Sequence, residues 1–362
     1  FKEKIISFLN SRKSKWIIVL AALCVWYWLS LPSPLFHSPT STVITDKNGI
    51  LLGAKIAADE QWRFPYNENI PDKFTKCILQ FEDRHFYYHP GFNPLALGRA
   101  IRQNIKARKR VSGGSTLTMQ VIRIARRSGR QESRNIFQKI VEIILATRLE
   151  LSYSKKEILA LYASHAPFGS NVVGLEAASW RYFGRRPEQL SWAETATLAI
   201  LPNAPSLIYP GKNKEKLFAK RNRLLDRLQK ANIIDSATCA ISKQEPLPEK
   251  PFPLPQLAPH LLTRVSKEGH KGKNVPTTLD GTLQHQVNRI IEHHHKTLSQ
   301  NEIHNACAIV LDVETGNVLA YTGNTTTINS EHGNDVDVIT AARSTGSILK
   351  PLLYSSILSD GE

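Results

Sequence analysis

Two adjacent carboxylates, Glu82 and Asp83, stand in the stretch QFEDRHFYYHPGFNP (residues 80–94), and Arg84 follows at once. A carboxylate that moves protons needs a pKa tuned by its surroundings. Burial among aromatic side chains raises the pKa of a carboxyl group, and a nearby guanidinium lowers it. The stretch supplies both influences, so we interpret it as the edge of a site for proton transfer. The alternative is a surface turn with incidental charges.

A second group of polar residues lies in GGSTLTMQVIR, residues 113–123. Its glycines allow close approach of the backbone to a ligand. The hydroxyls of Ser115 and Thr116, the amide of Gln120 and the guanidinium of Arg123 follow as hydrogen-bonding groups. Residues 99–130 contain ten Lys or Arg residues and no acidic residue. This composition suits a pyrophosphate or an anionic lipid headgroup, and a solvated basic face is the alternative.

Two further spacings suggest chemistry. Lys139 and Glu142 are three residues apart and share one face of a predicted helix. Glu142 could be a second carboxylate beside Lys139, a phosphate-binding amine. The alternative is that the two residues form a surface ion pair. Near the end of the chain, SILK places Ser347 and Lys350 one helical turn apart. This is the Ser-x-x-Lys arrangement of a nucleophile and its amine, although the pattern is common by chance.

The elements that must position these residues change in kind along the chain. From about residue 71 to 243 the apolar residues recur at helical spacing. Residues 245–259 are rich in proline and predict a linker. Turn residues between apolar runs predict β-hairpins over residues 43–56 and 306–324.

The N-terminal part predicts a membrane anchor. Residues 16–31, WIIVLAALCVWYWLSL, are apolar and would cover roughly 24 Å as a helix, a little less than a ~30 Å hydrocarbon core. Basic residues precede them, so the positive-inside rule predicts a cytoplasmic tail and an exported body. A cleaved signal peptide is the alternative. The chain starts with Phe1 and stops within an apolar helical pattern, so we expect both natural termini to lie outside it.

The net charge of +16 favours an anionic partner, namely nucleic acid, an anionic membrane or a phosphorylated substrate. Export and the lack of a recognition module argue against nucleic acid. The four cysteines show no metal-ligand spacing, so we expect neither zinc nor a disulfide framework. Residues 293–295 are consecutive histidines, which predict a solvated helix face rather than a metal site.

Taken together, the motifs of residues 60–230 resemble the peptidoglycan glycosyltransferase domain (glycosyltransferase family 51) of class A penicillin-binding proteins. The matching stretches are EDRHFYYHPG, GGSTLTMQ, KIVEIILATRLE and YASHAPFG. Met119, Gln138 and Ser164 depart from the family pattern, and the TMQ and APFG variants are most similar to its 1C subgroup. From residue 276 the chain resembles the opening of a penicillin-binding transpeptidase, without the Ser-x-Asn and Lys-Thr-Gly elements.

The resemblance implies a mainly α fold with a lysozyme-like glycosyltransferase domain, an N-terminal transmembrane helix and a truncated α/β transpeptidase segment. The expected divisions are a cytoplasmic tail, the anchor, a linker with a hairpin, the glycosyltransferase domain, a Pro-rich linker and the incomplete transpeptidase part. Their bounds are 1–15, 16–31, 32–59, 60–243, 244–275 and 276–362.

The resemblance also implies a reaction, in which lipid II is polymerised into β-1,4 glycan strands with inversion and release of undecaprenyl pyrophosphate. Glu82 would be the base and Glu142 the second carboxylate, while Ser347 and Lys350 would act in the transpeptidase of the full protein. Asp83 and His89 are expected to fix the loop between them. The implied substrate-binding residues are Asp83, Arg84, His89, Ser115, Thr116, Gln120, Arg123 and Lys139.

The resemblance allows Mg²⁺ or another divalent cation to bind at the pyrophosphate, but does not require one. It implies no organic cofactor. The expected partners are lipid II, the growing glycan strand, membrane lipids and other cell-wall synthesis proteins, with no nucleic acid. The expected location is the cytoplasmic (inner) membrane, with a single span, the N-terminus in the cytoplasm and the catalytic domain outside. A lytic transglycosylase and a non-catalytic lipid II-binding scaffold are the alternatives.

Overall fold

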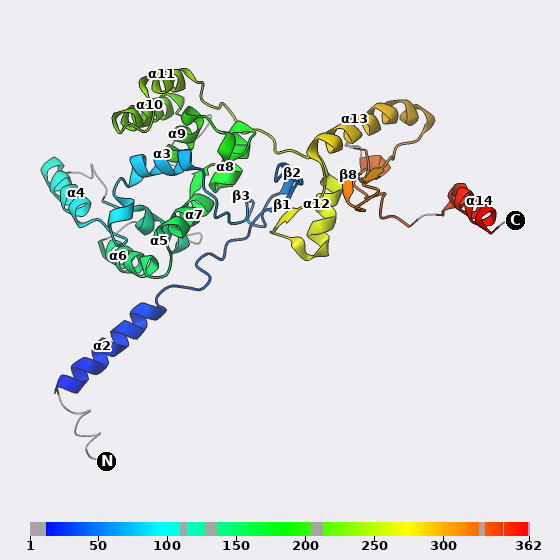
Figure 1. Cartoon of the computed structure of the whole chain (residues 1–362). Helices are drawn as coiled ribbons and strands as arrows, with labels where there is room; N and C mark the ends of the chain where they lie inside the picture. The colour runs from blue at the N-terminus through cyan, green and yellow to red at the C-terminus, as the bar shows by residue number, and fades with distance from the viewer. Residues whose placement is uncertain are drawn as a thin grey trace, which may run out of the picture. The chain divides into compact units, whose positions relative to one another are not determined.

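The structure, a computed structural model, describes residues 12–108, 114–126, 136–203, 213–325, 330–342 and 344–360. The chain forms two compact units, each assembled from segments that are distant in the sequence (Figure 1). The first unit comprises Phe1–Val43, Lys55–Leu254 and Gly272–Asn274. The second comprises Ile44–Ala54, Pro255–Lys271 and Val275–Glu362.

The first unit is mainly helical, as predicted, with a small three-stranded sheet of order β3-β5-β4. Strand β5 pairs parallel with β3 and antiparallel with β4. The helices and strands are α2 (Arg12–Leu29), β3 (Trp62–Arg63), α3 (Asp72–Glu82), α4 (Pro94–Ala107), α5 (Leu117–Arg126), α6 (Ile136–Glu150), α7 (Lys155–His165), β4 (Pro167–Gly169), β5 (Val172–Val173), α8 (Leu175–Phe183), α9 (Trp192–Ile200), α10 (Lys214–Lys230) and α11 (Ser236–Gln244). Short 3₁₀ helices are η1 (Phe86–Tyr88), η2 (Pro187–Gln189) and η3 (Leu201–Asn203).

Helix α9 is the centre of the packing around α3. It begins with a capping box in which Ser191 and Glu194 satisfy each other's backbone N–H groups. Most of its later residues are small, so α3 and α10 can pack closely against it. Phe74 and Ile78 of α3 are buried. The last residue of α3, Glu82, is thereby held in a fixed place.

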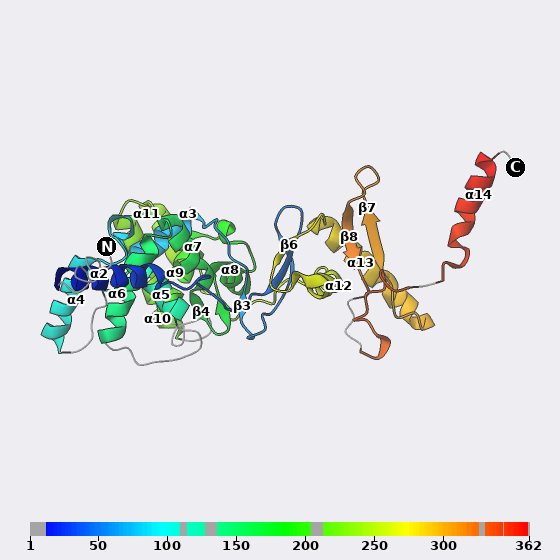
Figure 2. The same ribbon diagram turned by 90° about the horizontal axis from the view of Figure 1, so that it is seen from below.

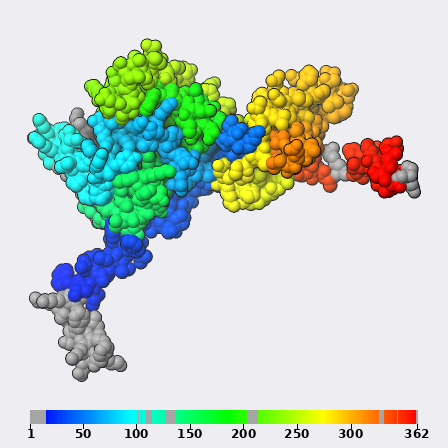
Figure 3. Space-filling view, viewed as in Figure 1, coloured from blue at the N-terminus to red at the C-terminus, as the bar shows by residue number. Residues whose placement is uncertain are grey.

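Helix α5 forms a second centre of packing, in contact with α6 and α7. Its residues Leu117, Val121 and Ile122 are buried. Figure 3 shows these helices as part of one packed body in cyan and green, with α4 at its edge. Gly114, just before α5, lies against the α4 backbone, where an added Cβ would come within 2.8 Å of the Leu97 Cα.

The structure confirms both predicted hairpins, which lie mainly in the second unit. Strands β1 (Thr42–Thr45) and β2 (Leu51–Lys55) are neighbours in a sheet of order β2-β1-β6, with β6 spanning Asn274–Pro276. Strands β7 (Ala308–Leu311) and β8 (Val318–Thr322) pair antiparallel, and α13 (Gly281–Leu298) packs on β8 (Figure 2). The remaining elements are α12 (Pro259–Val265), η4 (Ser266–His270), η5 (Ser299–Asn301), η6 (Ser330–His332), η7 (Gly346–Leu349) and α14 (Lys350–Ser359).

The predicted transmembrane helix over residues 16–31 is not supported. Residues 16–29 of this segment fall in α2, whose first turn contains Arg12, Lys13 and Lys15. Because these basic residues belong to α2, the apolar part of the helix covers only residues 16–29. Within the described part of the chain, no helix is long and apolar enough to cross a membrane. The C-terminal end of α2 contacts α6, where the Tyr27 hydroxyl lies 3.0 Å from the Thr147 hydroxyl.

We expect Gly114→Ala to destabilise the protein by about 1–3 kcal/mol, because the new methyl group would overlap the α4 backbone. Gly98→Ala is the matched control. Gly98 lies within α4, and a methyl group added there would have no neighbouring atom within 4 Å, so this change should stabilise by about 0.5–1 kcal/mol. Urea unfolding of the two purified variants measures both effects, and equal midpoints would contradict the close approach at Gly114.

Candidate active site

Glu82 ends α3 half-buried, with two amide groups directed at its carboxylate. Gln120 donates from Nε2 to Oε2 at 2.8 Å, and Asn203 donates from Nδ2 to Oε1 at 3.3 Å. Burial raises the pKa of Glu82, and these two hydrogen bonds and the charge of Arg123 only partly offset that rise. A carboxylate held in this balance is suited to accept a proton.

The orientation of the Asn203 amide is fixed by Lys220. The ammonium of Lys220, on α10, donates to Oδ1 of Asn203 at 3.1 Å. Since an ammonium group can only donate, the amide oxygen faces Lys220 and the NH₂ group faces Glu82. Neither Asn203 nor Lys220 was predicted as a site residue, because no chemical pattern in the surrounding sequence distinguishes them.

Arg123 and Glu142 form a two-pronged ion pair between α5 and α6. Nε and Nη2 of Arg123 each lie 2.9 Å from a different oxygen of Glu142. Nη2 also donates to the Ser115 hydroxyl at 3.2 Å. Glu142 is 5% exposed, and such a paired geometry gives strong, directional hydrogen bonds. Gln120 and Arg123 are three residues apart on α5, so both point to the same side of that helix.

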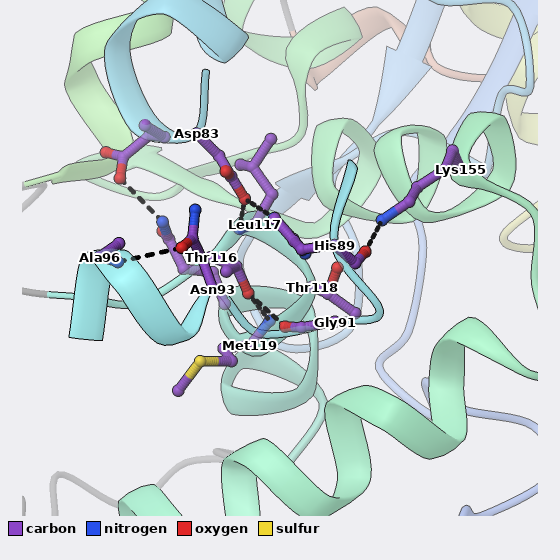
Figure 4. A network of polar contacts seen from close by, with 12 residues as sticks. Asp83, His89, Gly91, Asn93, Ala96, Thr116, Leu117, Thr118, Met119 and Lys155 are labelled. Carbon is purple, nitrogen blue, oxygen red and sulfur yellow. Dashed lines mark hydrogen bonds and ion pairs between the residues drawn. The ribbon is translucent and has the colours of Figure 1, made fainter. Parts of the chain in front are cut away.

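A network of buried polar contacts holds the loop after Glu82 (Figure 4). Oδ2 of Asp83 lies 2.9 Å from Nε2 of His89 and accepts the Leu117 N–H, at the start of α5, at 3.1 Å. Lys155 donates to the His89 carbonyl at 2.8 Å. The Thr116 hydroxyl donates to the Gly91 carbonyl at 2.6 Å. The loop is therefore tied to the first turns of both α5 and α7.

These contacts sort the predicted site residues into groups. Glu82, Ser115, Gln120, Arg123 and Glu142 come together through the hydrogen bonds and the ion pair described above. Asp83, His89 and Thr116 are buried and engaged within the loop network, and their contact with substrate stays a prediction. Arg84 is exposed. Lys139 is half-buried on α6.

Ser347 and Lys350 lie in the second unit, on η7 and at the start of α14. Both are exposed. A serine nucleophile needs a nearby base and a shaped pocket to become reactive. In the described part of the second unit this pair lies on an exposed helix surface, and its role as nucleophile and amine stays a prediction.

The three departures from the family motifs fall at different kinds of position. Met119 is 1% exposed and belongs to the core of α5. Ser164 accepts the Asn67 N–H through its hydroxyl, at 3.5 Å. Gln138 is half-buried near the start of α6. The Met119 side chain therefore packs in the core and does not line the cavity beside Glu82.

A cavity of about 800 Å³ lies beside this cluster. Its wall includes Gln120 and Asn203, which donate hydrogen bonds to Glu82. It also includes Arg123, whose charge lowers the pKa of Glu82. Tyr162 and His165 of α7 line it as well, together with residues 36–39. The cavity is large enough for sugar rings and meets the carboxylate cluster on one side.

The described residues around Glu82 and Glu142 do not by themselves form a binding site for a divalent cation. Both oxygens of Glu142 accept hydrogen bonds from Arg123. In the described ranges, no group of three or more His, Cys, Asp or Glu side chains is placed to hold a metal ion. Mg²⁺ would need phosphate or water oxygens for most of its ligands.

Comparison with known proteins identifies the domain that carries this cluster. Residues 51–229 match the family model "Transglycosylase". The chain is 34% identical to penicillin-binding protein 1C of Escherichia coli (strain K12) over 98% of its length and 46% of that protein's. Residues 51–229 therefore form a domain of the transglycosylase family.

Two other penicillin-binding proteins are similar to smaller shares of the chain. Penicillin-binding protein 2D of Bacillus subtilis (strain 168) is 28% identical over 91% of this chain and 48% of its own length. Penicillin-binding protein 1A of Aquifex aeolicus (strain VF5) is 30% identical over 73% of this chain and 37% of its own. The chain thus spans less than half the length of these relatives.

We expect the burial of Glu82 to cost stability at neutral pH. Well below pH 4.5, its usual pKa, the carboxyl group is protonated in both the folded and the unfolded chain. As the pH rises through the raised pKa, the folded chain must carry a buried charge, so stability falls. Glu82→Gln should therefore be more stable than the native chain at pH 7, with no difference at low pH.

Thermal unfolding between pH 3.5 and 8 measures this difference. Glu157→Gln serves as the control of opposite sign, because hydrogen bonds from Ser154 lower the pKa of that exposed carboxyl group. The stabilising effect of Glu157 is present at neutral pH and is lost as the pH falls. A Glu82→Gln variant that is less stable than the native chain at pH 7 would contradict the burial of that charge.

Proposed function

We propose that this protein is a peptidoglycan glycosyltransferase that polymerises lipid II into β-1,4 glycan strands. The observation that carries the proposal is the half-buried carboxylate of Glu82 beside a cavity whose wall includes Arg123. A transfer between a sugar hydroxyl and a sugar pyrophosphate needs one group to accept a proton and another to stabilise a leaving anion. The cluster contains both at one side of one cavity.

In the proposed step, the 4-hydroxyl oxygen of the acceptor sugar attacks the anomeric carbon of the donor. Glu82 accepts the hydroxyl proton. The new C–O bond forms as the bond from the anomeric carbon to the pyrophosphate oxygen breaks, and undecaprenyl pyrophosphate departs with the bonding electrons. A single displacement inverts the anomeric carbon, which follows the two-carboxylate logic of inverting glycosidases.

Arg123 would stabilise the charge that develops on the pyrophosphate. Its contacts with Glu142 and Ser115 use Nε and Nη2. Guanidinium has five N–H donors, so Nη1 can serve a phosphate oxygen while the pair with Glu142 holds the group in place. In this proposal Glu142 orients Arg123, and no organic cofactor takes part.

A lipid-linked substrate requires the protein to work at a membrane, and we propose the outer face of the cytoplasmic membrane. Support comes from α4 and its surroundings, where apolar side chains face outward. Leu95 is 86% exposed, and Tyr88 and Ile105 are also exposed. Arg99 and Arg102 on the same helix are exposed too. Apolar and basic side chains together favour the headgroup region of anionic lipids.

We further propose that Ser347 and Lys350 belong to an acyl-transfer site that is completed in a longer protein. Their Ser-x-x-Lys spacing on a 3₁₀ turn and helix supports this assignment. Other cell-wall synthesis proteins are the proposed protein partners.

The decisive test is polymerisation of labelled lipid II in detergent, comparing the native chain with Glu82→Gln. We expect glycan polymer from the native chain and at least a 100-fold lower rate from the variant, because general base catalysis contributes about 10²–10⁴-fold. Glu176→Gln is a matched control. This carboxyl group also has a pKa raised by burial, but it accepts from Asn67 and lies outside the cavity.

Other products would point elsewhere. Lipid II that binds without reacting would favour a scaffold, and anhydro-sugars released from cell walls would favour a lytic enzyme. Polymer formed equally by the native chain and Glu82→Gln would show that Glu82 is not the base.

A further inference from the structure

Arg63 of β3 lies in the wall of the cavity beside Glu82, and the reaction above does not use it. It shares this wall with Gln120 and Arg123. The Arg63 side chain is only 10% exposed. Buried guanidinium groups normally have hydrogen-bond partners for their N–H donors, so the partners of this one show what it does.

The backbone around Arg63 holds the side chain in a fixed place. The Arg63 N–H donates to the Ser41 hydroxyl at 3.2 Å, and the Arg63 carbonyl accepts from the Ser41 N–H at 2.7 Å. In addition β3 pairs with β5, where Arg63 lies opposite Val173. Successive residues of a strand point to opposite faces, so Trp62 lies against the Arg181 guanidinium while Arg63 lines the cavity.

One nitrogen of the Arg63 guanidinium makes all of its side-chain hydrogen bonds to described residues. Nη1 donates to the Asp59 carboxylate at 2.9 Å and also to the Pro39 carbonyl. Nε and Nη2 make no hydrogen bond with any described residue, and neither nitrogen is sealed from solvent. Because the side chain is otherwise buried and lines the cavity, the cavity is the space that these two donors reach.

The edge formed by Nε and Nη2 matches a carboxylate, because two parallel N–H groups meet its two oxygens. The chain contains this arrangement at Arg123, whose Nε and Nη2 each lie 2.9 Å from a different oxygen of Glu142. In Arg63 the same edge has no carboxylate of the described residues on it. The cavity wall thus contains two guanidinium groups, one neutralised along this edge by the protein and one not.

The charges around Arg63 leave it able to attract an anion. Asp59 offsets part of its charge, but the Asp59 side chain is 36% exposed and bonds to Nη1, away from the Nε–Nη2 edge. Burial lowers the pKa of His165 to about 4, and the charge of Arg63 adds to that shift, so this ring is neutral at pH 7. It stacks on Phe36 with centroids 3.6 Å apart. His37 lines the cavity as well.

We propose that the Nε–Nη2 edge of Arg63 binds a carboxylate of the peptide that lipid II carries on its disaccharide. This inference rests on the proposed function, in which the reacting sugar lies at Glu82 and its pyrophosphate at Arg123. The peptide branches from the saccharide, so it can extend along the cavity toward Arg63. Arg63 then selects substrates with an acidic peptide and takes no part in the chemical step.

The test compares two forms of labelled lipid II, one with free peptide carboxylates and one in which these are converted to carboxamides of nearly the same size. For the native chain we expect kcat/KM to be roughly ten- to a hundredfold lower with the carboxamide form, the value of hydrogen bonds to a charged group. Arg63→Gln should show the lower value with both forms. The change should lie in KM, because a contact remote from the reacting atoms binds ground state and transition state alike.

Two further variants separate recognition from folding. Arg181→Gln is the matched control, because Arg181 also donates to a backbone carbonyl, that of Phe252, but lies outside the cavity. It should keep the native ratio of kcat/KM between the two forms. Arg63→Lys keeps the positive charge without the two-pronged edge, so its preference for the carboxylate form should be smaller than the native one. This variant also gives an answer if Arg63→Gln does not fold.

Equal kcat/KM of the native chain for the two forms would overturn the proposal. So would a native preference for the carboxylate form in the Arg63 variants, because a purely structural role lowers activity with both forms alike. If the native chain makes no polymer from either form, the proposed function fails and binding decides the inference. Glu82→Gln should then bind the carboxylate form more tightly and Glu82→Gln/Arg63→Gln should bind both forms equally, whereas equal binding by Glu82→Gln overturns the contact.

Discussion

The burial of the Glu82 carboxylate is the constraint on which the rest of the first unit depends. Burial raises the pKa of this group, so the fold must supply donors that keep the charged form accessible. Gln120 reaches it from α5 and Asn203 from η3, and Lys220 of α10 sets the Asn203 amide. Several helices must therefore be packed correctly before this one carboxylate acquires its properties.

The two adjacent acids of the first motif have different roles because they point in different directions. Glu82 is the last residue of α3 and faces the cavity residues of α5. Asp83 follows the helix and turns toward the loop, where it pairs with His89 and accepts the Leu117 N–H. One carboxylate is thus available for chemistry, and its neighbour fixes the start of the helix that carries Gln120 and Arg123.

The ion pair with Arg123 determines the role of the buried carboxylate of Glu142. Arg123 and Glu142 are both largely removed from solvent, and each lowers the cost of burying the other. The pair also links α5 to α6, so the position of the guanidinium depends on the packing of both helices. A phosphate that meets Arg123 would encounter a group whose orientation is already set.

The sequence by itself determined the residues of the cluster, because short motifs fix residue type and local spacing. It predicted the helical region, both hairpins, and Glu82, Gln120, Arg123 and Glu142 as neighbours in function. Its membrane helix is not supported, because the structure includes the basic residues Arg12, Lys13 and Lys15 in α2, and no helix of the described residues is long and apolar enough to cross a membrane.

Only the tertiary structure decided which polar groups face one another. Asn203, Lys220 and Arg63 come from η3, α10 and β3, and no local pattern marks them, because their surroundings are made by contacts between distant segments. Burial likewise separated Met119, a core residue, from its neighbour Gln120 at the site. Local sequence specifies chemistry at each position, whereas burial and orientation arise only when the helices pack.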